Sequence, residues 1–368
     1  MEWIWQLKKW SQFEYNVDLL TEYERQFHSN VGKVFGAISH LEASNLEHLK
    51  IDILTQEAVS TSSIEGEILQ RDLVQSSIRK HLGLKSDDKK ILPNVIGISE
   101  MMVDVYLNYD KPSTHETFFS WHSMLMKERK DLETIGNYRT HTEPMQIVSG
   151  NLSNQKVFYE APPSFKVYDE MEKFIAWYNE QLAKQSGIPI LVLAGIAHLY
   201  FEIIHPFEDG NGRIGRALVE KIISQKIKMP ALNSFAKIIE IHKKEYYSAL
   251  QACNNSLNIN AWLNFFSRML IESQEYTISM VDFLVLKSKL FSKFNTQLNE
   301  RQSKVLLRIF DAGLEGFNGG LSAANYKSIS KASPATITRD LQELVNLKIL
   351  SKTGELKHTR YFLNLEKI

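Results

Sequence analysis

The chain has 368 residues, which is enough for one large domain or for two to three ordinary ones. Hydrophobic residues make up 43% and charged residues 23% of the sequence, a balance that is typical of a globular protein and excludes a disordered tail or a fibrous repeat. Lys plus Arg and Asp plus Glu both number 43, so no global charge attracts nucleic acid or an anionic membrane, and binding of either needs a local patch.

Cysteine usage and the apolar stretches indicate the compartment. Cys253 is the single cysteine, which excludes an intrachain disulfide and favours a reducing environment. Residues 1–10 lack the apolar run of a secretory signal. The most apolar stretch, 188–204, is short and contains Pro189 and Glu202, which favours a buried helix over a membrane span. We therefore expect a cytoplasmic protein that does not engage a membrane.

Most of the chain has apolar residues at the three-to-four spacing of helices, so we expect a mostly α fold. In chain order, helices are expected within 41–82 and over 94–107, 167–178, 189–204 and 213–227, with a polar loop at 85–90. Residues 136–163 differ, because they are rich in Thr, Val, Tyr and Asn and end in Pro162-Pro163. This composition predicts a β-hairpin or an extended flap.

The C-terminal residues 298–368 form a candidate separate unit of α+β type. Helices are expected over 301–312, 322–330 and 333–347, and a two-stranded hairpin over 352–363 turns at Thr353-Gly354. This order resembles a winged helix. An excess of about four positive charges is small for a DNA-binding unit, so DNA ranks below protein as its partner.

The most informative segment is the loop His205-Pro-Phe-Glu-Asp-Gly-Asn-Gly-Arg-Ile-Gly-Arg216, which follows one predicted helix and opens the next. Gly210 and Gly212 flank Asn211 and allow positive φ, so successive N–H groups can form an anion-binding nest at a helix N-terminus. Arg213 and Arg216 are three residues apart and share a helix face, where planar guanidinium groups suit phosphate oxygens. The spacing therefore predicts a phosphate site.

Two further side chains give this loop its chemistry. Asp209 places a carboxylate beside the nest, which would repel phosphates unless a divalent cation lies between them, and Mg²⁺ favours that arrangement. His205 supplies a base that titrates near neutral pH. The loop thus predicts a nucleotide phosphate site with a metal ion and a general base.

The same segment matches every specified position of HPFx(D/E)GNGRxxR and resembles the signature of the Fic family of AMP-transferring enzymes. The resemblance implies a helical Fic fold with a β-hairpin flap. It also implies transfer of AMP from ATP to a Ser, Thr or Tyr hydroxyl of a target protein, or of the chain itself, with release of pyrophosphate. His205 would take the hydroxyl proton, Asp209 would hold Mg²⁺ on the α- and β-phosphates, and Arg216 would reach the γ-phosphate. The other nucleotide-binding positions implied are Gly210, Asn211, Gly212, Arg213, Ile214 and Gly215.

A second resemblance concerns regulation. Thr61-Ser-Ser-Ile-Glu65-Gly66 fits the inhibitory motif (S/T)xxxE(G/N) of Fic proteins that restrain themselves, and it precedes the core, as in the class with an N-terminal inhibitory helix. The resemblance implies that Glu65 pairs with Arg216, so that ATP binds without its γ-phosphate held in a productive pose.

Two more stretches resemble Fic features. Gly136–Arg139 followed by Val148-Ser149-Gly150 resembles the entry to a flap that docks the target in extended form, with Ser149 and Gly150 touching the nucleotide. Tyr246-Tyr247 with Asn254 resembles the lining of an adenine and ribose site, although two core aromatics on a helix would look the same.

The resemblance also implies a domain plan. We expect an N-terminal helical region over 1–95 with the inhibitory helix at about 50–70, a Fic core over 96–285, and the winged-helix-like unit over 298–368. The aromatic cluster at Trp3, Trp5, Trp10 and Phe13 is expected to pack on the helical body, with an exposed docking patch as the alternative.

Three alternatives to AMP transfer stay open. The same site could remove AMP from a modified protein, with Glu65 orienting a water. The chain could instead be a regulator that senses ATP and binds DNA through its C-terminal unit, without catalysis. Transfer of phosphate or phosphocholine on the same fold ranks lower. The expected partners are ATP and a target protein docked on the flap, and a homodimer is left open.

Overall fold

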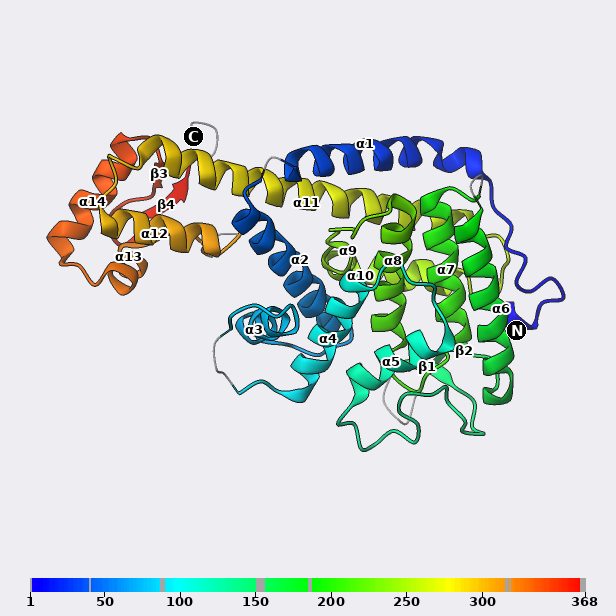
Figure 1. Ribbon diagram of the computed structural model, residues 1–368. Coiled ribbons are helices and arrows are strands. Elements are labelled where there is room, and N and C mark those ends of the chain that lie inside the picture. The colour runs from blue at the N-terminus through cyan, green and yellow to red at the C-terminus, as the bar shows by residue number, and fades with distance from the viewer. Residues whose placement is uncertain are drawn as a thin grey trace. The chain divides into compact units, whose positions relative to one another are not determined.

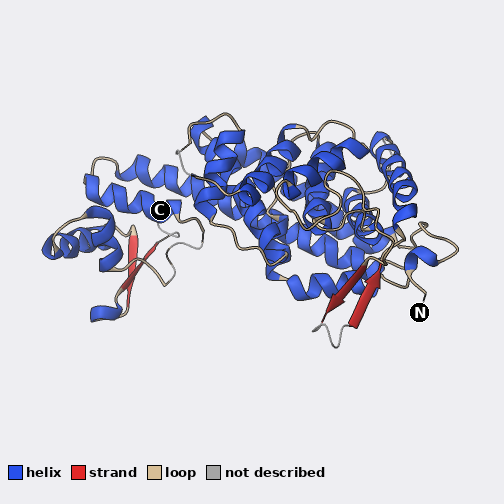
Figure 2. Ribbon diagram, turned by 90° about the horizontal axis from the view of Figure 1, so that it is seen from below, coloured by secondary structure: helices blue, strands red, loops and turns tan. Residues whose placement is uncertain are grey.

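The computed structural model describes residues 2–39, 41–86, 90–149, 156–184, 187–314, 317 and 319–364 (Figure 1). These residues form a predominantly helical protein with two short hairpins (Figure 2), so the expected mostly α fold is confirmed. The chain divides into two compact units. Unit 1 comprises 1–32 and 50–277, and unit 2 comprises 33–49 and 278–368.

The helices that lie wholly in unit 1 are α3 (Arg71–His81), α4 (Pro93–Leu107), α5 (His115–Met126), α6 (Ser164–Ala183), α7 (Ile190–Ile204), α8 (Asn211–Ile227), α9 (Phe235–Ile241) and α10 (Lys243–Ala252). Three others contribute residues to both units: α1 (Thr21–Ile38), α2 (Ala43–Ile64) and α11 (Asn260–Phe294). The region expected to be helical over 41–82 is therefore two helices, α2 and α3. Three-residue and four-residue 3₁₀ turns precede α1, at Ile4–Gln6 and Val17–Leu20.

Helix α7 forms the centre of unit 1. It is apolar around nearly its whole circumference and is buried almost throughout, which is the pattern of a helix enclosed on all sides. Helix α8 packs beside it (Figure 1). The connection between α7 and α8 is the glycine-rich loop, so the predicted site lies at the end of the buried central helix.

The flap expected within 136–163 is an antiparallel hairpin of β1 (Gln146–Ser149) and β2 (Lys156–Glu160). Its register shifts between Ile147 and Val148, which is a bulge-like irregularity. Ser149 is the last residue of β1, and Gly150 lies outside the described residues. Tyr159 on β2 donates from its hydroxyl to the Ile203 carbonyl at 2.7 Å, which holds the hairpin against α7.

Unit 2 has its own apolar core, in which Leu290, Val305, Leu306, Leu344 and Ile349 are fully buried. It contains α12 (Glu300–Asp311), α13 (Ala323–Ser330), α14 (Pro334–Asn346) and a hairpin of β3 (Leu350–Thr353) and β4 (Arg360–Leu363). Ser333 caps α14 and Pro334 follows at the first helical position, as predicted. The chain leaves β3 after Thr353, where the turn of the two-stranded wing was expected, and the connection to β4 includes a 3₁₀ turn over Leu356–His358.

None of the helices in the described part of the chain combines the length and apolar character needed to cross a bilayer.

Candidate active site

The loop between α7 and α8 is shaped by two residues with left-handed backbone conformations. His205 ends α7 with φ 49°, and Gly210 precedes α8 with φ 84°. A side chain on Gly210 would place its Cβ 2.6 Å from Met126 Cε, so both the backbone angle and the space require glycine. Asn211 ties the loop together, because its side chain accepts from Phe207 N at 2.9 Å and donates to Phe207 O at 2.7 Å.

Arg139 braces the loop from the side of the flap. Its buried guanidinium donates to the carbonyl of His205 at 2.9 Å and to Ser164 Oγ at 2.9 Å, and its backbone N–H donates to the Pro206 carbonyl at 3.0 Å. A further bond reaches the Pro162 carbonyl, at the end of the predicted flap segment. Arg139 therefore fixes His205 through backbone contacts and joins it to the flap.

His205 is held as a neutral imidazole. Burial lowers its pKa to about 4, and the nearby Arg139 guanidinium adds to this effect, whereas Glu65 and Asp209 act in the opposite direction. A neutral imidazole can accept a proton at pH 7, which is the requirement for a general base.

Glu65 and Arg216 form an ion pair with Arg216 Nη2 and Glu65 Oε1 at 2.7 Å. Arg216 is almost fully buried on α8, and its Nε also donates to Thr61 Oγ1 at 2.7 Å. Glu65 lies just beyond the last residue of α2, in a turn that Gly66 completes with φ 87°. The inhibitory helix was expected to extend over about 50–70, so it ends earlier than predicted and Glu65 lies outside it. A Cβ on Gly212 would lie 2.3 Å from Glu65 Oε1, which shows how closely this carboxylate approaches the loop.

Arg213 and Asp209 belong to a second charge network. Arg213 Nη1 lies 3.2 Å from Glu67 Oε2, and its Nη2 lies 3.4 Å from Asp209 Oδ1. Asp209 also pairs with Arg129 at 2.6 Å. Burial opposes the charge on Asp209, but the neighbouring Arg213 and Arg129 outweigh it and hold the pKa of that carboxyl below its usual range.

The residues near Asp209 fit a magnesium ion that arrives with a nucleotide. Within the described residues, no group of three or more His, Cys, Asp or Glu side chains is placed to hold a metal ion. Mg²⁺ commonly uses one or two carboxylates together with substrate phosphates and waters, so the ionised Asp209 beside the glycine loop is a sufficient protein ligand. Arg129 and Arg213 would have to release part of their hold on it.

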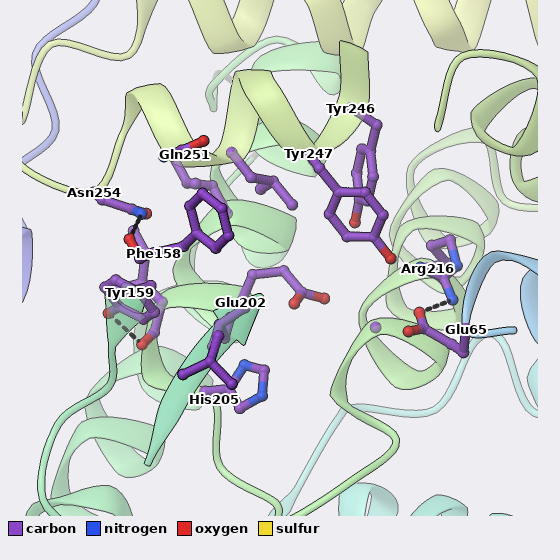
Figure 3. A pocket seen from close by; sticks show the side chains of 16 residues that line it. Glu65, Phe158, Tyr159, Glu202, His205, Arg216, Tyr246, Tyr247, Gln251 and Asn254 are labelled. Carbon is purple, nitrogen blue, oxygen red and sulfur yellow. Dashed lines mark hydrogen bonds and ion pairs between the residues drawn. The ribbon is translucent and has the colours of Figure 1, made fainter. Parts of the chain in front are cut away.

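A cavity of about 580 Å³ opens beside the loop (Figure 3). Glu65, Gly212 and Arg216 line one end, and Phe158, Tyr159 and Asn254 line the other. His205 and Glu202 lie between these ends, and Tyr247 points toward the Arg216 end (Figure 3). The cavity therefore has a charged end beside the glycine nest and an end built largely from aromatic and apolar side chains, which suits a nucleotide lying lengthwise.

The structure brings many of the predicted residues to this cavity but not all of them. His205, Gly212, Arg216, Tyr246, Tyr247, Asn254 and Glu65 line it. Arg213 and Asp209 line a separate cavity of about 420 Å³ together with Glu67 and Arg129. Ile214 is fully buried in the core, and Gly215 packs against His198 and Glu202. Thr61 supports Arg216, and the roles assigned to all these residues stay predictions.

Sequence reasoning missed two residues that lie at the site, Arg129 and Glu67. Arg129 pairs with Asp209, Glu67 pairs with Arg213, and Glu202 places a carboxyl in the cavity. Burial raises the pKa of Glu202 to about 8, and its Oε1 has no hydrogen-bond partner in the described part of the chain. Glu202 lies one helical turn before His205, and from the sequence it is expected to orient His205 or to pair with His198 in the core, whereas Arg129 and Glu67 carry no local signal.

Comparison with known proteins identifies the family of this site. Residues 112–223, which include the hairpin, α7 and most of α8, match the Fic/DOC family. The chain contains a Fic domain. Residues 3–84, before it, match a domain of unknown function, DUF4172. The glycine loop and its two flanking helices therefore belong to the Fic domain, and Glu65 comes from the preceding domain.

Curated relatives of the Fic domain carry names that describe an activity. Protein adenylyltransferase fic-1 of Caenorhabditis elegans is 22% identical over 242 residues, which are 64% of this chain and 44% of that protein. Protein adenylyltransferase Fic of Culex quinquefasciatus is 35% identical over 85 residues, 23% of this chain and 15% of that protein. The chain thus spans less than half the length of these relatives.

One solved structure shares the fold of nearly the whole chain. The crystal structure of a Fic family protein from Desulfovibrio desulfuricans superposes with a TM-score of 0.54 and covers 93% of this chain and 96% of that one. The identity is 20%, so this likeness shows the fold alone.

Proposed function

We propose that this protein transfers AMP from ATP to a Ser, Thr or Tyr hydroxyl of a protein, and that Glu65 restrains the reaction by holding Arg216. The observation that carries the proposal is the shared cavity of His205, Gly212, Arg216 and Glu65, in which Glu65 already pairs with Arg216 at 2.7 Å. The adenylyltransferase names of the Fic relatives support the class of reaction.

The chemistry follows from what the loop offers. Neutral His205 accepts the proton of the target hydroxyl, whose oxygen attacks the α-phosphorus of ATP. The bond from the α-phosphorus to the bridging oxygen breaks, and pyrophosphate leaves. The oxygen displaces pyrophosphate directly, so catalysis consists of positioning and of charge stabilisation by the N–H groups at the start of α8 and by Arg213.

Magnesium supplies charge neutralisation of the phosphates when it is bound, and Asp209 would be the residue that holds it. Arg213 and Arg129 keep this carboxylate ionised, and Arg129 Nη1 lies 2.6 Å from Asp209 Oδ2. The γ-phosphate would bind the guanidinium of Arg216, whose buried Nη1 has no hydrogen-bond partner among the described residues. Glu65 competes for the same guanidinium, because its carboxylate already accepts from Arg216 Nη2 at 2.7 Å.

The hairpin is the proposed docking site of the target. Ile147, Val148 and Val157 on its strands are each about two-fifths exposed, at 41%, 39% and 38%. An extended target segment could pair with a strand of the hairpin and place its hydroxyl near His205.

The proposal is tested with α-labelled ATP, Mg²⁺ and a lysate as the source of target. Glu65→Gly should raise AMP incorporation at least about ten-fold, which corresponds to removal of about 1.4 kcal/mol of restraint. Glu65→Gly with His205→Ala should return incorporation to background. If the Glu65→Gly protein gives only background incorporation of AMP, AMP transfer is contradicted. If wild type and Glu65→Gly give equal incorporation, the restraint by Glu65 is contradicted.

A second candidate is the reverse reaction, removal of AMP from a modified protein. It is favoured by the Glu65 carboxylate, which lines the same cavity as His205 and could orient a water there. Incubation of a target premodified by the Glu65→Gly protein with each form separates the two. Removal by wild type that is lost in Glu65→Gly supports this candidate, and retention of label with both supports transfer alone.

A further inference from the structure

The first residues of the chain contact the end of the cavity that lies away from the glycine loop. Ile4 N donates to the Asn254 carbonyl at 2.7 Å, and the indole Nε1 of Trp5 donates to the Glu160 carbonyl at 2.8 Å. The ring of Trp3 meets Tyr159 edge-on, with centroids 5.6 Å apart. In both overall views, the start of the chain lies on the side of unit 1 that carries the hairpin (Figures 1 and 2).

Two of the residues that receive these contacts, Tyr159 and Asn254, line the cavity, and the third, Glu160, follows Tyr159 on β2. Phe158 and Tyr159 on β2 form one wall, and Asn254, just after α10, forms the other. The Asn254 side chain donates to the Phe158 carbonyl at 2.8 Å and so joins the two walls (Figure 3). Residues 3–5 thus contact both walls without lining the cavity themselves.

The Asn254 wall depends on this support because its own backbone is irregular. Residues 253–259, between α10 and α11, contain no helix and no regular strand. Glu14 N donates to the Leu257 carbonyl at 2.7 Å, and Ile259 N donates to the Glu14 carbonyl at 3.0 Å. Asn255 donates to the Glu2 carbonyl at 2.7 Å. The N-terminal segment therefore supplies the backbone partners that a helix would otherwise supply.

We propose that residues 3–5 are positioning residues for the base of the nucleotide, because they bind both the β2 wall and the Asn254 wall and so support the arrangement that the Asn254–Phe158 hydrogen bond alone holds at one point. This inference rests on the proposed function. It assigns a role in nucleotide binding to the first residues of the segment that matches the domain of unknown function. A planar base needs a slot of fixed width, and a slot whose walls drift apart loses contact with the base while the phosphate end stays intact. The segment thus acts on affinity for the base and not on the transfer step.

The test uses two matched tryptophans of the same segment in the full-length Glu65→Gly protein. Trp5→Phe removes the indole donor to Glu160 and keeps an aromatic ring. Trp10→Phe is the control, since its indole donates to Glu170 Oε2 at 2.7 Å and Glu170 is on α6, whereas Glu160 is on β2 directly after the lining residue Tyr159. Trp3→Leu, which removes the contact with Tyr159, is the second variant if Trp5→Phe does not fold.

Trp5→Phe should raise KM for ATP roughly five-fold, the effect of one lost hydrogen bond, with kcat within about two-fold of the parent. Calorimetry should show weaker binding of ATP but unchanged binding of tripolyphosphate, which reaches the phosphate end alone. Trp10→Phe should leave both ligands unaffected, whatever it does to the melting temperature.

Equal weakening of ATP and tripolyphosphate, equal effects of the two tryptophan variants, or an unchanged KM for ATP would overturn the inference. These outcomes differ from failure of the proposed function. If the Glu65→Gly protein binds ATP but transfers no AMP, the proposed reaction falls, whereas the calorimetric comparison still decides the role of residues 3–5.

Discussion

His205 and Glu202 lie one helical turn apart on α7, and burial shifts both toward their uncharged forms. The pKa of His205 is lowered to about 4, and that of Glu202 is raised to about 8. At neutral pH the middle of the cavity therefore presents an imidazole that can accept a proton and a carboxyl that adds no negative charge. An ionised Glu202 would instead repel the phosphates that Arg216 is proposed to bind.

The shift of His205 predicts the acid side of the pH profile. In the Glu65→Gly protein, kcat/KM for AMP transfer should change by no more than about two-fold between pH 7 and pH 5.5. An imidazole with its ordinary pKa of about 6.5 would be mostly protonated at pH 5.5 and would lose roughly ten-fold over this range. The interval stops at pH 7 because Glu202 begins to ionise above it. The rate of label transfer at constant ionic strength provides the measurement.

The control for this profile is stability, because the same shift weakens the fold in acid. A histidine whose folded pKa lies below its unfolded value stabilises the folded state less as pH falls through about 6.5. Thermal unfolding at pH 5.5 must therefore show a folded enzyme before the rate is interpreted. A ten-fold fall in kcat/KM with an intact fold would mean that His205 titrates normally or is not the base.

At the scale of elements, several polar contacts join the last turns of α2 to the rest of unit 1, and three of them come from Glu57, Ser60 and Thr61. Glu57 accepts from the Ala236 N–H at 2.9 Å, at the start of α9, and Ser60 Oγ donates to Glu240 at 2.7 Å. Thr61 accepts from Arg216 Nε at 2.7 Å. The first two contacts hold the helix, whereas the third holds the arginine that Glu65 neutralises. The proposed restraint would thus depend on how α2 ends as well as on the Glu65 carboxylate.

Thr61→Val should relieve part of the restraint. The substitution keeps the shape of the side chain but removes the hydroxyl that accepts from Arg216, a charge-assisted bond worth about 1.5–3 kcal/mol. The Thr61 carbonyl still accepts from Arg216 Nη2 at 3.0 Å, so release is incomplete. AMP incorporation should rise roughly three-fold to five-fold, less than in Glu65→Gly, when both are measured with α-labelled ATP.

Ser60→Ala is the matched control, because it removes a hydroxyl from the same turn of α2 whose partner is Glu240. It should leave incorporation at the wild-type level. If Ser60→Ala and Thr61→Val raise incorporation equally, general loosening of α2 is the cause, and the specific contact between Thr61 and Arg216 has no part in it.

The elements of the site differ in how far the sequence could predict them. The glycine loop was accessible because His205, Asp209, the two glycines and Arg216 lie within twelve consecutive residues, and their spacing alone places them around one turn. The motif at Thr61–Gly66 predicted the partner of Glu65 but not its place beyond the end of α2, since propensity does not fix the last residue of a helix. The pairing of residues 3–5 with Asn254 and β2 was out of reach, because it joins segments about 150 to 250 residues apart.

At the scale of the whole molecule, the chain holds two separate apolar cores. One includes α7, α8 and the first part of α11, and the other joins the end of α11 to α12, α14 and β3. The expected boundary near residue 285 falls inside α11, which continues to Phe294, because the helical periodicity does not break where one core gives way to the next. Whether unit 2 binds DNA or protein stays a prediction.

Separate cores predict that nucleotide binding stabilises only one of them. All described residues that line the cavity belong to unit 1, and a ligand that binds the folded form alone stabilises it by about 2.7 kcal/mol at 100 times its Kd. In the Glu65→Gly/His205→Ala protein, which should bind ATP without turnover, Mg²⁺ and ATP should slow exchange of the most protected amides in α7 and α8 by up to about 100-fold. Hydrogen exchange followed by mass spectrometry should show no change in α12–α14. Equal slowing in α12–α14 would mean that the two cores unfold cooperatively. The helix that contributes residues to both cores, α11, would then couple their unfolding.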